Sequence, residues 1–103
     1  YFFITYCVIE NNSYGIMSES FYPVNVDYSI LRDNSITGII STHNWAANRE
    51  CIVISNSLVS SNCNGLVTDL DMIIKKCTIV NNTNYGIING YGASTVKSSI
   101  IYG

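Results

Sequence analysis

The sequence is short of helix formers and of charge. Only 4 of its 103 residues are Leu, and Asp, Glu, Lys and Arg together make up 12%. The chain contains instead 16 Ile, 8 Val, 13 Asn, 13 Ser and 8 Tyr, residue types that favour strands and turns. The composition therefore argues against a helical protein, and the length allows one domain at most, over residues 1–103.

The chain also lacks a basic stretch and a long apolar run. Its net charge is −2, and its five basic residues, Arg32, Arg49, Lys75, Lys76 and Lys97, are scattered along the sequence. A protein that follows a phosphate backbone needs a stripe of such residues, so we expect no nucleic-acid partner. No apolar run approaches the ~18 residues that span a bilayer, and we expect no membrane span.

A segment built around a glycine recurs four times. The copies are VIENNSYGIMS (8–18), ILRDNSITGIIS (30–41), LVSSNCNGLVT (58–68) and TIVNNTNYGIIN (78–89). These repeat glycines are 23, 27 and 21 residues apart and are Gly15, Gly38, Gly65 and Gly86. A repeat of this length is typical of a solenoid.

A second pattern precedes each glycine segment. An apolar anchor is followed by two variable residues, by Cys or Ser, and by an apolar pair, as in ITYCVI (4–9). The other copies are VDYSIL (26–31), ISNSLV (54–59), IKKCTI (74–79) and VKSSII (96–101). The anchors are 22, 28, 20 and 22 residues apart and are Ile4, Val26, Ile54, Ile74 and Val96. Two patterns with the same period indicate a true structural repeat.

Each repeat thus offers three short apolar segments separated by turns. We expect each set of three strands to close one triangular coil, with like strands of successive coils paired in parallel. Inward Ile and Val side chains then stack ~4.8 Å apart, which suits a narrow interior. The small polar residues between the first two strands form a structural ladder that we expect to bond turn amides of adjacent coils. Its members are Cys7, Ser29, Ser57, Cys77 and Ser99.

This repeat resembles the right-handed parallel β-helix repeats of the pectate-lyase-like superfamily. The resemblance lies in the anchor with its small polar residue and Ile, in the Asn-rich turn and in Gly-Ile, and it covers essentially the whole chain. It implies an all-β, right-handed parallel β-helix, a single-stranded solenoid with three short parallel sheets. The family often carries an asparagine ladder at the bend, where this sequence has Ser and Cys. A leucine-rich repeat has a similar period, but four leucines disfavour it.

The ends of the sequence lack the capping segments that a solenoid needs. Ile4 is already an anchor, the last residues, SSIIYG, stop in mid-coil, and the chain has neither an initiating Met nor a signal peptide. We therefore expect a fragment of a longer protein, with further β-helix coils at both ends. The resemblance implies an extracellular or cell-surface protein, with a polysaccharide or cell-surface glycan as its partner.

The four cysteines are not spaced for a disulfide or for zinc. Cys7 and Cys77 share a column but lie three coils apart, roughly 14 Å, beyond the ~7 Å limit for a disulfide. Cys51 and Cys63 fall elsewhere in the repeat. No Cys-x-x-Cys pair occurs and the chain has one histidine, so we expect no zinc site. We expect Cys7 and Cys77 to be small, buried, apolar side chains.

In the superfamily that the chain resembles, function usually lies on the outer face of the Gly-Ile sheet and on its loops. Alternation places two rows on that face. The first row is apolar and consists of Met17, Ile40, Val67 and Ile88. The second row consists of Glu19, Thr42, Asp69 and Gly90. Glu19 and Asp69 are candidate ligand-binding residues, whereas the apolar row suits a covering loop or a partner chain better than an acidic polysaccharide.

The longest repeat contains an insertion, THNWAANREC (42–51), with the sole His and the sole Trp. Insertions in solenoids often carry binding residues. Here His43 is a candidate base, Arg49 a candidate partner for a carboxylate and Trp45 a candidate platform for a sugar ring, with Glu50 beside them. The alternative is that Trp45 covers the sheet as an apolar lid and that Arg49 and Glu50 are solvated surface charges.

No complete catalytic motif is present. Polygalacturonases of the superfamily carry Asn-Thr-Asp, Asp-Asp, Gly-His-Gly and Arg-x-Lys, and none of these occurs here. Asp69 and Asp71 are a candidate calcium pair, but calcium prefers about six to eight oxygen ligands, so we expect no cofactor. Three hypotheses remain open. They are a structural or carbohydrate-contacting scaffold, part of a polysaccharide lyase or glycoside hydrolase whose catalytic coils lie partly outside this chain, and a self-associating segment.

Overall fold

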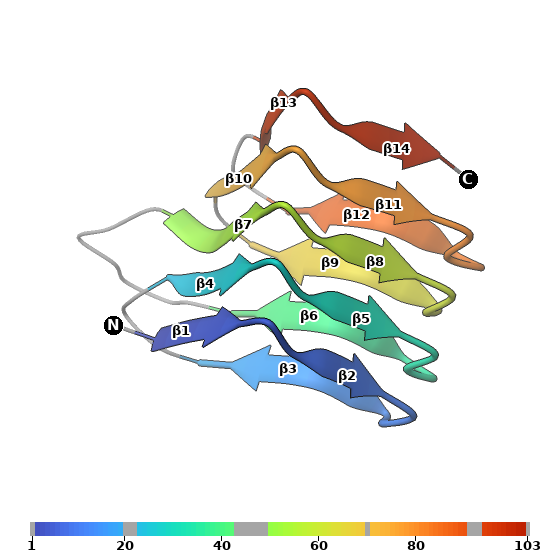
Figure 1. The fold of residues 1–103 in the computed structure, drawn as a ribbon. Coiled ribbons are helices and arrows are strands. Elements are labelled where there is room, and N and C mark those ends of the chain that lie inside the picture. The colour runs from blue at the N-terminus through green and yellow to red at the C-terminus, as the bar shows by residue number, and fades with distance from the viewer. Residues whose placement is uncertain (1, 20–22, 43–49, 70, 91–93, 103) are drawn as a thin grey trace.

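The structure is a computed structural model that describes residues 2–19, 23–42, 50–69, 71–90 and 94–102. These residues form fourteen short strands, β1 to β14 (Figure 1). The described part contains no helix long and apolar enough to cross a membrane. The strands belong to three sheets in which neighbours pair in parallel. The predicted all-β fold class is confirmed.

Each sheet collects one strand from every coil. Sheet A has the order β1-β4-β7-β10-β13, with strands Phe2–Thr5, Val24–Asp27, Glu50–Ser55, Asp71–Lys75 and Ser94–Lys97. Sheet B has the order β2-β5-β8-β11-β14, with strands Val8–Glu10, Ile30–Arg32, Leu58–Ser60, Thr78–Val80 and Ile100–Tyr102. Sheet C has the order β3-β6-β9-β12, with strands Tyr14–Ser18, Thr37–Ser41, Asn64–Thr68 and Tyr85–Asn89.

The chain passes through sheets A, B and C in turn and then begins the next coil (Figure 1). The described residues make four such coils and the first two strands of a fifth. Like strands lie beside one another, and the anchors pair in register in the order Ile4, Val26, Ile54, Ile74 and Val96. The predicted parallel β-helix with three short sheets is confirmed.

The core consists of stacked columns of aliphatic side chains. The anchors Val26, Ile54 and Ile74 are at most 1% exposed, and Ile39 and Leu66 of sheet C are fully buried. Each lies on the same residue type or a close relative in the next coil, because alternation turns every second residue of a strand inward. Burying one such side chain stabilises the fold by about 1.5–3 kcal/mol. The abundance of Ile and Val is therefore explained by these columns.

The first bend, between sheets A and B, ties each coil to the next through a Cys or Ser side chain. The Oγ of Ser29 donates to the carbonyl of Asp27 at 3.0 Å and accepts from the amide of Cys7 at 3.2 Å. Ser57 repeats this arrangement, donating to Ser55 at 2.7 Å and accepting from the amide of Ser29 at 3.1 Å. In the last described coils, the Oγ of Ser99 accepts from the amide of Cys77 at 3.1 Å.

The two cysteines of this ladder differ from each other. Cys77 is 2% exposed, and burial raises the pKa of its thiol. Cys7 is exposed, so the expectation that it is buried is wrong. It lies between β1 and β2, which are edge strands of their sheets. Both thiols donate to the carbonyl two residues earlier, Thr5 and Lys75 respectively, at 3.3 Å. Both cysteines therefore act as hydrogen-bonding groups at the bend. Cys7, Cys63 and Cys77 are all free thiols.

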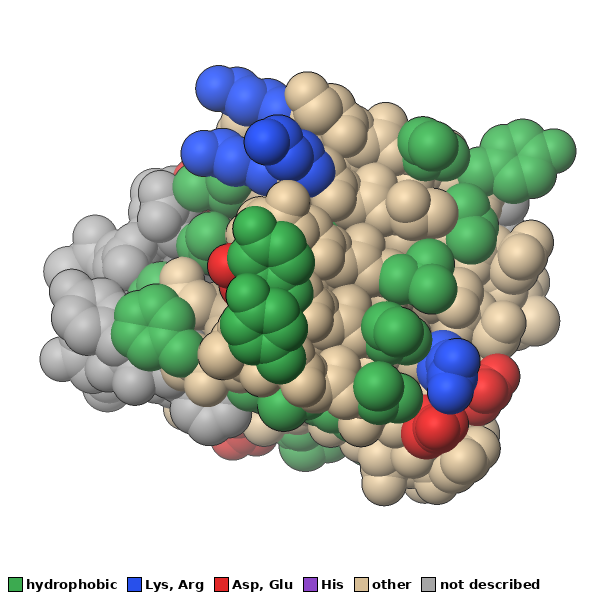
Figure 2. Space-filling view, in the orientation of Figure 1, with side chains coloured by type: hydrophobic (Ala, Val, Ile, Leu, Met, Phe, Trp, Pro, Cys, Tyr) green, Lys and Arg blue, Asp and Glu red, His purple; other side chains and the backbone are tan. Residues whose placement is uncertain are grey.

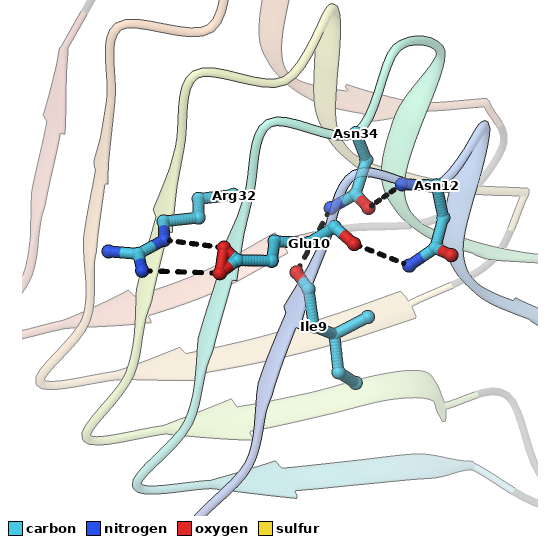
Figure 3. A network of polar contacts seen from close by, with 5 residues as sticks. All are labelled: Ile9, Glu10, Asn12, Arg32 and Asn34. Atoms are coloured by element: carbon cyan, nitrogen blue, oxygen red, sulfur yellow. Dashed lines mark hydrogen bonds and ion pairs between the residues drawn. The ribbon is translucent and has the colours of Figure 1, made fainter.

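The second bend, between sheets B and C, contains an asparagine ladder that was not predicted, in addition to the Ser and Cys side chains of the first bend. Asn34 donates from Nδ2 to Asn62 Oδ1 at 2.9 Å, and Asn62 donates to Asn82 Oδ1 at 3.1 Å. The backbone amides of Asn34 and Asn62 donate to the same two oxygens. In the first coil, the amide of Asn12 donates to Asn34 Oδ1 at 3.2 Å (Figure 3).

This ladder has a signal in the sequence. Asn12, Asn34, Asn62 and Asn82 are 22, 28 and 20 residues apart, the same spacings as those of the first four anchors. The three later members are 1% exposed. Buried amides at a constant position of the coil satisfy backbone groups that the turn leaves without strand partners.

The repeat glycines are required for space. A Cβ on Gly15 would lie 2.5 Å from the carbonyl oxygen of Gly38, and one on Gly38 would lie 2.7 Å from that of Gly65. Gly65 meets the carbonyl of Gly86 in the same way. A Cβ on Gly86 itself would meet only side chains, at 3.5 Å or more. The backbone of the following coil therefore excludes a side chain at the first three glycines.

Candidate functional site

The outer face of sheet C carries an apolar row. Met17 is 57% exposed, and Ile40, Val67 and Ile88 are half-buried. Parallel pairing sets Met17 beside Ile40, Ile40 beside Val67, and Val67 beside Ile88. This row offers apolar contact but no hydrogen-bonding side chains.

The second row lies just past the carboxyl ends of these strands. The hydrogen-bond ladder continues into it, because the amide of Thr42 donates to the carbonyl of Ser18 at 2.9 Å and that of Gly90 to Thr68 at 3.0 Å. Glu19 and Asp69 are exposed in this row. They belong to the first and third coils, so their backbones are about 10 Å apart at the usual strand spacing. The structure places both carboxylates on one edge without bringing them into contact.

The insertion falls largely outside the described residues. His43, Trp45 and Arg49 lie there, so their roles stay predictions. The backbone of Glu50 begins β7 and is the register partner of Asp71 at the start of β10, with an irregularity in the pairing between Asp71 and Met72. The insertion therefore follows β6 of sheet C in the sequence and runs into β7 of sheet A.

The two aspartates that suggested calcium lie on different sheets. Asp69 follows β9 of sheet C, whereas Asp71 is half-buried at the start of β10 in sheet A. Among the described residues, no three His, Cys, Asp or Glu side chains lie close enough to hold a metal ion together.

A charged pair links the first two coils on sheet B. Arg32 donates from Nη2 to Glu10 Oε1 at 3.3 Å and from Nε to Oε2 at 3.4 Å (Figure 3). The hydrogen bond and the negative charge of Glu10 raise the pKa of Arg32. Both side chains are substantially exposed, so this pair is a surface contact between coils and contributes little to stability.

The first bend presents a ridge of side chains that the sequence alone did not single out. The residue before each Cys or Ser has a positive φ, between 49° and 54°, in every coil. We call this column the first-bend ridge, and its members are Tyr6, Tyr28, Asn56, Lys76 and Ser98. The rings of Tyr6 and Tyr28 stack with centroids 5.2 Å apart and planes 5° apart. Figure 2 shows such a stacked apolar pair on this face, with basic side chains gathered nearby.

Three of the five basic residues meet at this corner. Lys75 and Lys97 are register partners on β10 and β13, and Lys76 follows Lys75 on the ridge. All three are exposed. These three residues lie side by side although Lys97 is distant in the sequence, because one turn of the solenoid brings residues 22 positions apart together. The signal in the sequence was the spacing of Lys75 and Lys97, which equals that of their anchors.

The fold defines the protein as a parallel β-solenoid of about four turns. Comparisons of the chain with protein-family models, with curated proteins and with solved structures find no match. The fold class therefore rests on the strand topology, and any narrower assignment rests on the repeat pattern and on the chemistry of the surface.

Proposed function

We propose that this chain is a rigid β-helix scaffold that contacts polysaccharide, as part of a secreted or cell-surface protein of the pectate-lyase-like kind. The observation that carries the proposal is the parallel pairing of like strands from coil to coil, which holds apart from a register shift between Asp71 and Met72. The strands of each described sheet pair without a break from the first coil to the last. Each outward position therefore recurs at about 4.8 Å along the axis.

A surface of this kind suits a ligand that is itself a repeating polymer. Half-buried side chains that alternate with core residues, such as Asn25, Ser60 and Thr78, offer hydrogen-bond donors and acceptors. One polymer chain can engage several coils at once. Several weak contacts on a rigid support add up without the entropy cost of ordering the protein. The inward side chains of the two bends supply this rigidity, since at both bends they are hydrogen-bonded from coil to coil.

A second candidate function is part of a polysaccharide lyase or glycoside hydrolase whose catalytic coils lie partly outside this chain. One observation favours it: exposed Asp69 and Glu19 lie on the edge of sheet C that leads into the insertion. Glycosidases use two carboxylates at most about 9.5 Å apart. The backbone separation of about 10 Å for two coils is close to that limit.

A binding and turnover assay separates the two candidates. The full-length protein that contains this chain is mixed with polygalacturonate, xylan and cellulose, and the bound fraction and the release of new sugar ends are both measured. Binding without turnover supports the scaffold. Turnover that Asp69→Ala abolishes, while Asp33→Ala at the exposed second bend does not, supports the enzyme. A chain that binds none of the polysaccharides contradicts the scaffold proposal.

A further inference from the structure

Two Asn-x-Ser/Thr motifs lie at the second bend. They are NNS (11–13) and NNT (81–83), and no other asparagine of the chain has Ser or Thr two residues later. This motif is the acceptor for N-linked glycosylation, in which the first Asn carries the sugar. Glu10 and Val80, which precede the motifs, belong to one column of sheet B. Asn11 and Asn81 therefore lie on the same corner, three coils and about 14 Å apart.

The fold does not require asparagine at the acceptor position. The equivalent residues of the second and third coils are Asp33 and Ser61, both with a φ of 57°. The asparagine ladder uses the next residue of each motif, Asn12 in the first coil and Asn82 in the fourth. Asparagine at the acceptor position is therefore required neither by the bend nor by the ladder.

The acceptor and hydroxyl side chains of both motifs are exposed. Asn81 and Thr83 are exposed, whereas Asn82 between them is 1% exposed. Asn11 and Ser13 are exposed in the first coil. Among the described residues, the side-chain amides of Asn11 and Asn81 make no hydrogen bond. A substituent on either amide nitrogen therefore breaks no contact of the fold.

The second bend has room for bulky groups. An N-linked glycan is large and polar, so it must lie on the surface of the folded protein. The second bend joins β2 to β3 and β11 to β12 along one outer corner of the solenoid (Figure 1). The residues between the two acceptors on this corner are Asp33 and Ser61, which are small and exposed. Two glycans about 14 Å apart therefore fit side by side.

We infer that Asn11 and Asn81 are N-glycosylation sites, each with an oligosaccharide on its Nδ2 atom. This inference rests on the secreted or cell-surface location in the proposed function and goes beyond it, since it assigns a covalent modification to two residues. The glycans would keep the second bend in contact with water, so a binding partner would have to use another face of the solenoid.

The modification is a group transfer without oxidation or reduction. The Nδ2 atom of the acceptor Asn forms a bond to C1 of the first sugar and loses one proton. The bond between C1 and the phosphate oxygen of a lipid-linked oligosaccharide breaks, and the lipid phosphate leaves with the electron pair. The co-reactant is thus a lipid-linked oligosaccharide, supplied with its transferase by the secretory pathway.

The second coil offers a matched variant. Its turn, Asp33-Asn34-Ser35, has the hydroxyl residue and the ladder asparagine but lacks the acceptor. Asp33 and Ser35 are exposed, like their counterparts in the two motifs. Asp33→Asn therefore completes the motif at the same place in the coil, with a φ that Asn11 and Asn81 already adopt.

The test is glycopeptide mass spectrometry of the full-length protein that contains this chain, isolated from the cells that produce it. We expect a glycan on Asn11 and on Asn81 and none on Asn84, an exposed asparagine of the same turn outside the motif. Variants are produced in the same cells. Thr83→Ala should remove the glycan from Asn81, whereas Thr83→Ser should retain it.

Asn11→Gln should remove the other glycan, and Asp33→Asn should add a third. Secreted or surface-bound protein with unmodified Asn11 and Asn81 overturns the inference and leaves the proposed function standing. Recovery of the protein from the cytoplasm alone overturns the secreted location and with it both proposals. A glycan on Asn81 that persists in Thr83→Ala overturns the assignment of the motif. An unmodified Asp33→Asn beside two occupied sites overturns the role given to the position in the coil.

Discussion

The two bends of each coil solve the same problem with different side chains. At the second bend, buried asparagines bond one another and the backbone in a continuous ladder through three coils. At the first bend, Ser or Cys bonds its own coil two residues back and one amide of the neighbouring coil. The asparagine ladder therefore joins more groups per residue, and its loss leaves more of them buried without a partner.

The side chains at the positive-φ positions of the two bends also differ, and here the first bend is the more varied of the two. At the second bend, the positive-φ residues are Asn11, Asp33, Ser61 and Asn81, all small polar residues suited to turns. At the first bend, the same conformation is held by Tyr6, Tyr28, Asn56, Lys76 and Ser98. Large side chains at this conformation cost free energy, so the second bend follows backbone preference while the first presents varied chemistry. We therefore regard the second bend as structural and the first bend as the candidate functional surface.

The largest effect should come from breaking the asparagine ladder at its centre. Asn62→Ala leaves the Asn34 amides and the carbonyl of Leu31 without their partner. We expect the free energy of unfolding to fall by about 3–5 kcal/mol, since each buried unpaired group costs about 1–3 kcal/mol. Urea denaturation measures it. The control is Asn84→Ala, whose amide bond to Asn64 is exposed; an equal loss there would contradict the ladder's role.

The next effect tests the spacing between coils beside the second bend. Gly65→Ala would place a Cβ against the carbonyl of Gly86, so the coils must move apart. We expect a loss of about 2–3 kcal/mol, in the range of overpacked cores. Gly86→Ala meets only side chains at ordinary contact distance and serves as the matched variant. Similar melting temperatures for the two variants would refute the requirement for space.

The first bend should respond more weakly. Ser57→Ala removes the bond to the Ser55 carbonyl and the acceptor for the amide of Ser29. We expect a loss of about 1–2 kcal/mol in urea denaturation. Ser57→Cys should cost less, because Cys77 occupies the equivalent position of the next coil and makes the same bond to its own coil. If Ser57→Ala costs as much as Asn62→Ala, the two bends do not differ in the way we describe.

The smallest effect concerns the pH dependence of the Cys77 thiol. Burial raises its pKa in the folded chain, so the unfolded chain loses the thiol proton first as the pH rises. The stability that the neutral thiol provides is complete at neutral pH and is lost as the pH rises through the ordinary thiol range of about 9 toward the raised value. Cys77→Ser lacks this dependence. Wild type should therefore lose slightly more stability than Cys77→Ser between pH ~7 and pH ~10, and parallel losses would show that the pKa of the thiol is the same in the folded and the unfolded chain.

The repeat pattern predicted the fold because every repeat imposes the same short alternation of inward and outward residues. A one-residue shift would turn every anchor outward, so five anchors at matching spacings leave one register. The asparagine ladder was missed although it has the same spacing. In two of its turns two asparagines are adjacent, Asn11 with Asn12 and Asn81 with Asn82, and in each pair the first residue has a positive φ while the second occupies the ladder position.

The prediction for Cys7 was wrong for a different reason. Its position in the column is the same as that of Cys77, but a column member is buried only where coils cover it on both sides, and Cys7 lies in the first described coil. The candidate residues His43, Trp45 and Arg49 stay predictions from the insertion alone.

The sequence by itself determined the parallel β-helix, its coil length and its core columns, because burial of Ile and Val imposes a strict alternation that every repeat must obey. Only the tertiary structure decided which polar and charged side chains share a surface. Lys75 and Lys97, or Tyr6 and Tyr28, become neighbours through the stacking of coils. Exposed positions need not be apolar, so no pattern within a single repeat predicts which side chains they contact. The chemistry of the surface therefore depends on how the coils stack.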